Sequence, residues 1–131
     1  MKYMLMMHAP KGDGDWQISS WTPEAFKAHI AHMKTLNQQL IKNGELVGAE
    51  GLAPPGDAKL IRVAPNGAPV TDGPFAEAKE FLAGYWIVQV DSAERAYQIA
   101  ALASSAPGPD GKPLVIPIEV RQVMDLPPDI M

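Results

Sequence analysis

The chain alternates short apolar runs with stretches rich in glycine and proline, a pattern typical of strands separated by loops. The first run, Lys2–His8, is followed by a Gly/Asp-rich segment, so the pattern predicts a buried first strand and a long loop after it. Four later segments predict further strands: residues 45–52, 59–64, 84–90 and 115–123. Pro117 has no N–H for a ladder bond, which places the last strand at an edge or a bulge.

A long helix is predicted between two local signals. Thr22 is a good N-cap, and Pro23 fits the first helical position, where its missing N–H does no harm. Asn43-Gly44 supplies the left-handed conformation on which helices commonly end. Apolar residues at 3.6-residue spacing then predict a core-facing stripe: Phe26, Ile30, Met33, Leu40 and Ile41.

The remaining signals complete the order of elements. Asp91, in the cap position, and Glu94, three residues on, predict the start of an alanine-rich helix that ends near Ser105. Asn66-Gly67 is a strong hairpin signal between two strand-like segments. The order is therefore βαββαβ with an extra hairpin arm, which predicts a ferredoxin-like α+β sandwich. The length of 131 residues fits a single domain over residues 1–131.

Two helices on one side of such a sheet leave its other face bare. Alternation assigns one face to the core: Trp86, Val88, Val90, Ile116, Ile118 and Val120. It assigns the opposite face to polar residues: Tyr85, Gln89, Glu119 and Arg121, with Arg62 expected beside them. A second copy of the chain can close this face through a two-fold axis, which predicts a homodimeric α+β barrel with a cleft for a small ligand. The alternative is that Glu119 and Arg121 form ion pairs in the interface.

Composition narrows the partners. The formal charge of −4 argues against nucleic acid, whose phosphates require a basic face. The chain has no cysteine, which removes disulfides, thiolate metal sites and cysteine nucleophiles and suits the reducing cytoplasm. The first apolar run is too short to span a membrane, and we expect no membrane partner. Motifs for phosphate or dinucleotide binding are absent from the sequence.

Asp72 and His32 are the candidates for acid–base chemistry. Asp72 begins an Asp-Gly-Pro turn that can hold its carboxylate at the rim of a cleft, although an Asp there also stabilises the turn itself. His32 lies at the edge of the apolar stripe, where a histidine can reach a cleft or simply face solvent. His29 lies about 60° from Phe26 on the helical wheel, inside the stripe, and we interpret it as a structural residue.

Other candidates are less specific. Trp16, in the loop before the first helix, can cover a pocket and contact a substrate, and Arg62, Tyr85 and Arg121 are the further predicted substrate-binding residues. Packing of Trp16 over the helix start is the alternative. The two helix histidines have no third ligand at a recognisable spacing, so we predict no metal and no cofactor.

The stretch "VTDGPFAEAKEFLAGYWIVQV" resembles the signature segment of the DGPF, or YCII-related, family of small bacterial proteins. The first strand, the Trp-containing loop, the long helix, "NGELVGAEGLAP" and "IEVRQV" extend the resemblance over most of the chain. The resemblance implies a ferredoxin-like fold that pairs into a dimeric α+β barrel with a small-molecule site. Many DGPF proteins are encoded beside extracytoplasmic sigma factors, which implies a stress or regulatory setting.

The resemblance also implies a site. In the wider YCII-related group a helix histidine and an aspartate are the proposed catalytic pair, and one lineage is similar to dehydrochlorinases of chlorinated hydroquinones. The helix histidine corresponds to His32. The group's Asp-Pro-aromatic motif after the second helix is missing here, so Asp72 is its substitute. Two functions follow: a cofactor-independent lyase or dehydrochlorinase-like enzyme, or a non-catalytic dimeric module that binds a metabolite or has a regulatory role in a sigma-factor system.

Overall fold

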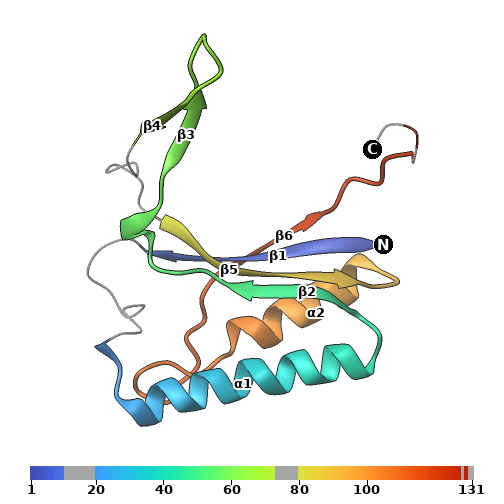
Figure 1. Ribbon diagram of the computed structural model, residues 1–131. Coiled ribbons are helices and arrows are strands. Elements are labelled where there is room, and N and C mark those ends of the chain that lie inside the picture. Colours follow the sequence, from blue (N-terminus) through green and yellow to red (C-terminus); the bar gives the residue numbers. More distant parts are fainter. Residues whose placement is uncertain (11–19, 73–79, 128, 130–131) are drawn as a thin grey trace.

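The computed structural model describes residues 1–10, 20–72, 80–127 and 129 (Figure 1). Within these ranges the elements are, in chain order, β1 (Lys2–Pro10), α1 (Pro23–Lys42), β2 (Leu46–Gly51), the 3-10 helix η2 (Pro55–Asp57), β3 (Leu60–Val63), β4 (Pro69–Asp72), β5 (Glu80–Gln89), α2 (Ala93–Ser104) and β6 (Ile118–Gln122). No helix of the described residues is long and apolar enough to cross a membrane.

The main sheet has the strand order β2-β5-β1-β6, and every neighbouring pair is antiparallel. Figure 1 shows α1 and α2 on one face of this sheet. This arrangement confirms the predicted ferredoxin-like α+β fold. β6 lies at an edge of the sheet, as the position of Pro117 just before it predicts.

The ends of α1 lie where the sequence predicts them. The Thr22 hydroxyl accepts a hydrogen bond from the amide of Ala25 at 3.2 Å, which satisfies one donor of the first turn. Asn43 is the C-cap, and Gly44 follows with φ of +71°, a conformation that glycine adopts without a steric penalty. The chain is thereby directed from α1 into β2.

The start of α2 differs from the prediction by one residue. Ser92, and not Asp91, is the N-cap, and its hydroxyl accepts from the amide of Arg95 at 3.2 Å. Ser92 has the extended backbone of a cap, with φ of −152°, so its side chain reaches the third amide of the helix. The end of α2, with Ser105 as its C-cap, is as predicted.

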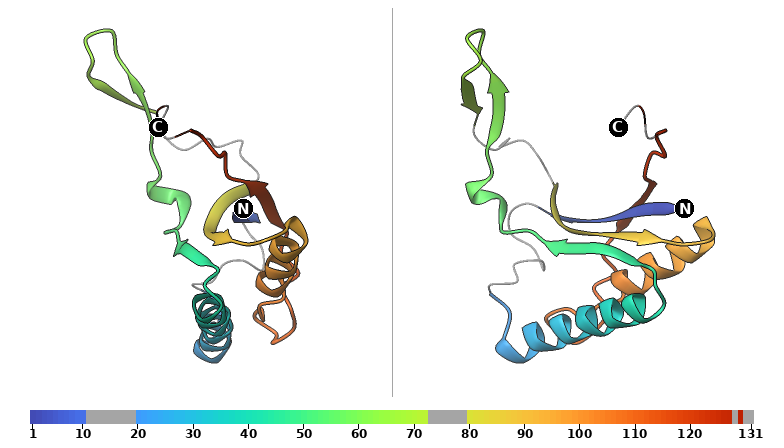
Figure 2. Two further views of the ribbon diagram at one scale, coloured as in Figure 1. Left: turned by 90° about the vertical axis from the view of Figure 1, so that its right-hand side faces the viewer. Right: turned by 45° about the vertical axis from the view of Figure 1, so that its right-hand side comes forward.

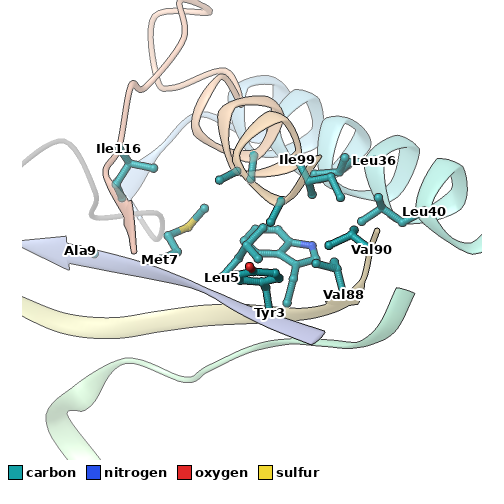
Figure 3. Packing of buried hydrophobic residues seen from close by; sticks show 14 residues of the cluster. Tyr3, Leu5, Met7, Ala9, Leu36, Leu40, Val88, Val90, Ile99 and Ile116 are labelled. Atoms are coloured by element: carbon teal, nitrogen blue, oxygen red, sulfur yellow. The ribbon is translucent and has the colours of Figure 1, made fainter. Parts of the chain in front are cut away.

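The core lies between the helices and the sheet (Figure 3). Trp86 and Val88 of β5 face it, which confirms the predicted alternation, and Leu36 and Leu40 of α1 pack against it. Four buried residues of α2 complete this side: Ala96, Ile99, Ala100 and Ala103. Close packing also explains Gly84 in β5, where an added Cβ would lie 2.9 Å from the carbonyl oxygen of Glu50.

The predicted core-facing stripe of α1 is only partly right. The buried residues of the helix are His29, Leu36 and Leu40. Ile41 is 64% exposed, so its position on the helical wheel points away from the sheet. Phe26 and Ile30 are about two-fifths exposed, because a cavity, and not the core, lies beside them.

β3 and β4 form a two-stranded sheet of their own, the hairpin arm. The Asn66-Gly67 turn is confirmed: Gly67 has φ of +87°, and the Asn66 side chain accepts from the amide of Ala68. Figures 1 and 2 show the arm rising from the side of the main sheet that the helices leave uncovered. Arg62 belongs to the arm, so the expectation that it lies on the main sheet beside Tyr85 is wrong. Among the described strands, the strand that carries Arg62 pairs with β4 alone and is not part of the main sheet.

Candidate functional site

A cavity of about 860 Å³ opens between one side of α1, from Pro23 to Asn37, and the strands β2 and β5. Six residues of α1 line it: Pro23, Phe26, His29, Ile30, Met33 and Asn37. Apart from the adjacent pair His29 and Ile30, these positions are three or four residues apart, so one side of the helix faces the cavity. From the sheet come Met7, Ala49, Phe81 and Trp86, and the segment after β2 adds Leu52, Pro54 and Pro55.

His29 is buried in the wall of this cavity, with 3% of its surface exposed. Its Nδ1–H donates to the carbonyl oxygen of Pro107 at 3.1 Å, because a carbonyl can only accept. The ring also meets Trp21 edge-on, with centroids 5.3 Å apart. His29 therefore links α1 to the loop after α2 and contributes to the cavity at the same time.

The environment of His29 favours its neutral form. Burial lowers the pKa of the imidazole, the hydrogen bond to Pro107 opposes this shift, and repulsion from His32 adds to it. Since the ordinary pKa of histidine is about 6.5, a lowered value leaves the ring uncharged at neutral pH. The cavity wall therefore holds an imidazole without a positive charge.

Asn37 is fixed by a hydrogen bond to the sheet. The indole Nε1–H of Trp86 donates to Oδ1 of Asn37 at 2.8 Å. An indole nitrogen can only donate, so this bond decides which end of the amide is the oxygen. The Asn37 side chain therefore has a defined orientation at the cavity wall.

His32 lies elsewhere. Its Nε2–H donates to the backbone carbonyl oxygen of Leu102 at 2.8 Å, so the ring is bound to α2. The residues that line the cavity include His29 and not His32. The predicted general acid or base therefore lies on a different side of α1 from the residues that line the cavity.

The other predicted site residues are spread over the molecule. Asp72 ends β4 at the base of the arm, and its side chain lies outside the described residues, as do the Gly73–Phe75 part of the "DGPF" turn and Trp16. The pairing of His32 with Asp72 therefore stays a prediction. Tyr85 borders the cavity from β5, Arg121 lies on the edge strand β6, and Arg62 lies in the arm.

The uncovered side of the main sheet is less polar than expected. Directly paired residues share a face, and two rows cross it: Tyr85, Met6 and Glu119 in one, Ile87, Met4 and Arg121 in the other. We call these six residues the open face. At its β6 edge Glu119 lies 3.2 Å from Nε2 of His8 and 3.8 Å from Nε of Arg121. The prediction placed Tyr85 and Arg121 on this face correctly but missed its apolar centre.

Sequence reasoning also missed the cavity and the part that Asn37 and His29 play in it. A signal was available, because Asn37 continues the spacing of Phe26, Ile30 and Met33 and puts a polar group on an apolar stripe. Among the described residues no three His, Asp or Glu side chains gather closely enough to hold a metal ion. The two polar side chains of α1 that line the cavity, His29 and Asn37, are neutral at pH 7.

Comparison with known proteins agrees with this fold. A protein of Rhizobium meliloti (strain 1021), named Uncharacterized protein R00369, is 28% identical over 109 residues, which cover 83% of this chain and 88% of that protein. Its name assigns no ligand and no reaction. The family model of the YCII-related domain matches residues 1–106, a segment that contains every described residue lining the cavity. Since that match takes in well over half of the chain, the protein belongs to the YCII-related domain family.

Proposed function

We propose that this YCII-related protein binds a small molecule in the cavity beside α1. The observation that carries the proposal is the cavity itself: its volume of about 860 Å³ lies in the range of ligand sites, and its walls are largely apolar and aromatic. A surface of this kind is poorly hydrated, so a ligand that replaces the water gains hydrophobic free energy.

The proposal is tested by filling the cavity. Ala49 lines it from β2, and Ala49→Phe puts a ring into the space. Val47 belongs to the same strand but is 53% exposed and outside the cavity, so Val47→Phe is the matched control. We expect compounds selected from a metabolite library by quenching of tryptophan fluorescence to lose at least about tenfold in affinity with Ala49→Phe and almost nothing with Val47→Phe. Equal affinity in both variants contradicts the proposal.

We also propose that the chain forms a homodimer through the open face. Met4, Met6 and Ile87 make an apolar centre that no described helix covers. The charges at the β6 edge are self-complementary: a two-fold axis crossing between Glu119 and Arg121 brings each carboxylate near the other subunit's guanidinium. Figures 1 and 2 show the arm and the segment after β6 rising on this same side, where they would flank the second copy.

Mass measurement by light scattering tests the dimer. Ile87→Asp places a charge in the apolar centre, and we expect it to convert the dimer to monomers. Tyr97→Asp is the control, because Tyr97 is an exposed apolar residue, at 56% exposure, that lies on α2 on the opposite side. A wild-type monomer at micromolar concentration, or an Ile87→Asp dimer, contradicts this interface.

Catalysis by His32 and Asp72, in a cofactor-independent lyase or dehydrochlorinase-like enzyme, remains a separate proposal that rests on the family resemblance. The non-catalytic binding module is the better supported of the two, because the cavity is lined by His29 and His32 is bound to α2. We place both alternatives in the cytoplasm, where a chain without cysteine needs no oxidising compartment.

A further inference from the structure

The described residues in the cavity wall provide no counter-ion for a charged ligand group. Lysine and arginine are absent from the described residues that line it. Glu50 borders the cavity, but it is exposed and lies opposite Tyr85, whose side chain belongs to the open face. His29 is held neutral by its burial. A charged ligand group would lose its hydration here without gaining a counter-ion.

One polar group has a defined role in this wall. Because Trp86 occupies Oδ1 of Asn37, the amide offers a molecule in the cavity its two N–H donors. A donor in an apolar site selects for a ligand that carries an acceptor, since a ligand without one leaves the N–H groups unpaired. The acceptor can be the oxygen of a ketone, an ether or an uncharged hydroxyl group.

The shape of the lining favours a flat ligand. Aromatic rings of Trp21, Phe26 and Phe81 border the space, and Pro54 and Pro55 add rigid apolar surface at its edge. Aromatic groups stack on rings or meet their edges, and they lose little conformational entropy when they bind.

We propose that the cavity takes an uncharged ring compound whose oxygen acceptor receives a hydrogen bond from the Asn37 amide. This inference rests on the proposed binding function and names the chemical class of its ligand. Asn37 is the residue that selects for the acceptor, and the absence of lysine and arginine from the described part of the wall is what rejects anions.

Three probes with the same ring system separate these features: 2-acetylnaphthalene, 2-ethylnaphthalene and 2-naphthoate. Quenching of the Trp21 and Trp86 fluorescence reports binding at the cavity. We expect 2-acetylnaphthalene to bind about threefold to tenfold more tightly than 2-ethylnaphthalene, because of one hydrogen bond. We expect 2-naphthoate to bind weakest, by at least about tenfold relative to 2-acetylnaphthalene.

Two pairs of variants locate the effects. Asn37→Asp keeps an acceptor for Trp86 but removes the two N–H donors. Asn37→Leu removes the acceptor and the donors without adding charge. In each variant the preference for 2-acetylnaphthalene over 2-ethylnaphthalene should vanish. Ile30→Lys adds a cation to the cavity wall, whereas Ile41→Lys adds one to the same helix outside the cavity. Only Ile30→Lys should strengthen 2-naphthoate binding, by about tenfold.

The outcomes separate this inference from the binding function. If wild-type protein prefers 2-naphthoate, or if both Asn37 variants keep the acetyl preference, the ligand class is wrong while binding in the cavity stands. If none of the three probes binds, the ligand class is likewise overturned. The binding function itself fails only when Ala49→Phe and Val47→Phe affect library ligands equally.

Discussion

One set of apolar residues on α1 packs in the core against the sheet, whereas another set on the same helix borders a cavity. Leu36 and Leu40 are buried in the core, but Phe26 and Ile30 remain about two-fifths exposed although they are equally apolar. Leu36 and Leu40 stabilise the fold because their side chains are removed from water and closely packed. The second pair keeps apolar surface available for a ligand, so one helix serves both stability and binding through different side chains.

Core truncation should give the largest difference between the two sets. Leu40→Ala removes a side chain that is 1% exposed, and we expect it to lower the free energy of unfolding by about 2–5 kcal/mol. Ile30→Ala should cost less than about 1 kcal/mol, because its side chain is partly in water already. Urea unfolding measures both. Similar losses for the two variants would show that the set beside the cavity is packed as tightly as the set in the core.

An ion pair secures the C-terminal end of α1. Glu45, directly before β2, accepts two hydrogen bonds from Arg95 of α2, at 2.8 and 2.9 Å. The Arg95 hydrogen bond is the main cause that lowers the pKa of Glu45. A lowered carboxyl pKa stabilises the fold above the unfolded value, about 4.3, and this contribution is lost as the pH falls through the folded value.

Glu45→Gln should therefore cost about 1–2 kcal/mol at pH 7, and the difference from wild type should shrink towards pH 3. A double-mutant cycle with Arg95→Gln, followed by urea unfolding at both pH values, isolates the pair. Additive single effects at pH 7 would mean that the two side chains contribute independently.

His29, in the cavity wall, should make a smaller contribution than Glu45 to the pH dependence of stability. Its pKa is lowered by burial, so the neutral ring stabilises the fold above the unfolded value of about 6.5, and this stability declines as the pH falls below it. Between pH 7.5 and pH 5.5 the Tm of wild-type protein should fall by a few degrees more than that of His29→Gln. The same pH dependence in both proteins would show that His29 does not titrate in this range.

His32 should have a small effect on stability, and its substitution tests the proposed catalysis. His32→Ala removes one partly exposed hydrogen bond to Leu102, at a cost of about 0.5–1.5 kcal/mol. If the predicted enzyme exists, turnover found in a substrate screen should disappear with His32→Ala and with Asp72→Asn. Full turnover in both variants would remove this pair from the mechanism.

The sequence predicts those features that local signals determine. Thr22, Gly44 and Asn66-Gly67 act through their own backbone and near neighbours, so the ends of α1 and the hairpin turn follow from residue type alone. Alternation likewise predicts the two faces of β5, because a buried strand repeats every two residues. Asp91 and Ser92 are both good caps, and local signals do not distinguish such neighbours.

Features that depend on distant elements were not predictable in the same way. Which part of the α1 stripe packs on the sheet depends on how closely the helix approaches it, and this distance is not encoded in the spacing of Phe26 and Ile30. The position of Arg62 depends on whether the hairpin joins the main sheet. The different surroundings of His29 and His32 depend on the loop after α2 and on α2 itself, which the chain brings to α1 from more than 60 residues away.

The central claim, that one side of α1 and the sheet enclose a ligand site, is tested most directly by NMR chemical shifts. On addition of 2-acetylnaphthalene, or of the tightest library compound, the shifts of Phe26, Ile30 and Ala49 should change most, and those of Leu36 and Leu40 should change little. Changes concentrated at Met6, Ile87 and Arg121 would place the ligand on the open face and contradict the account.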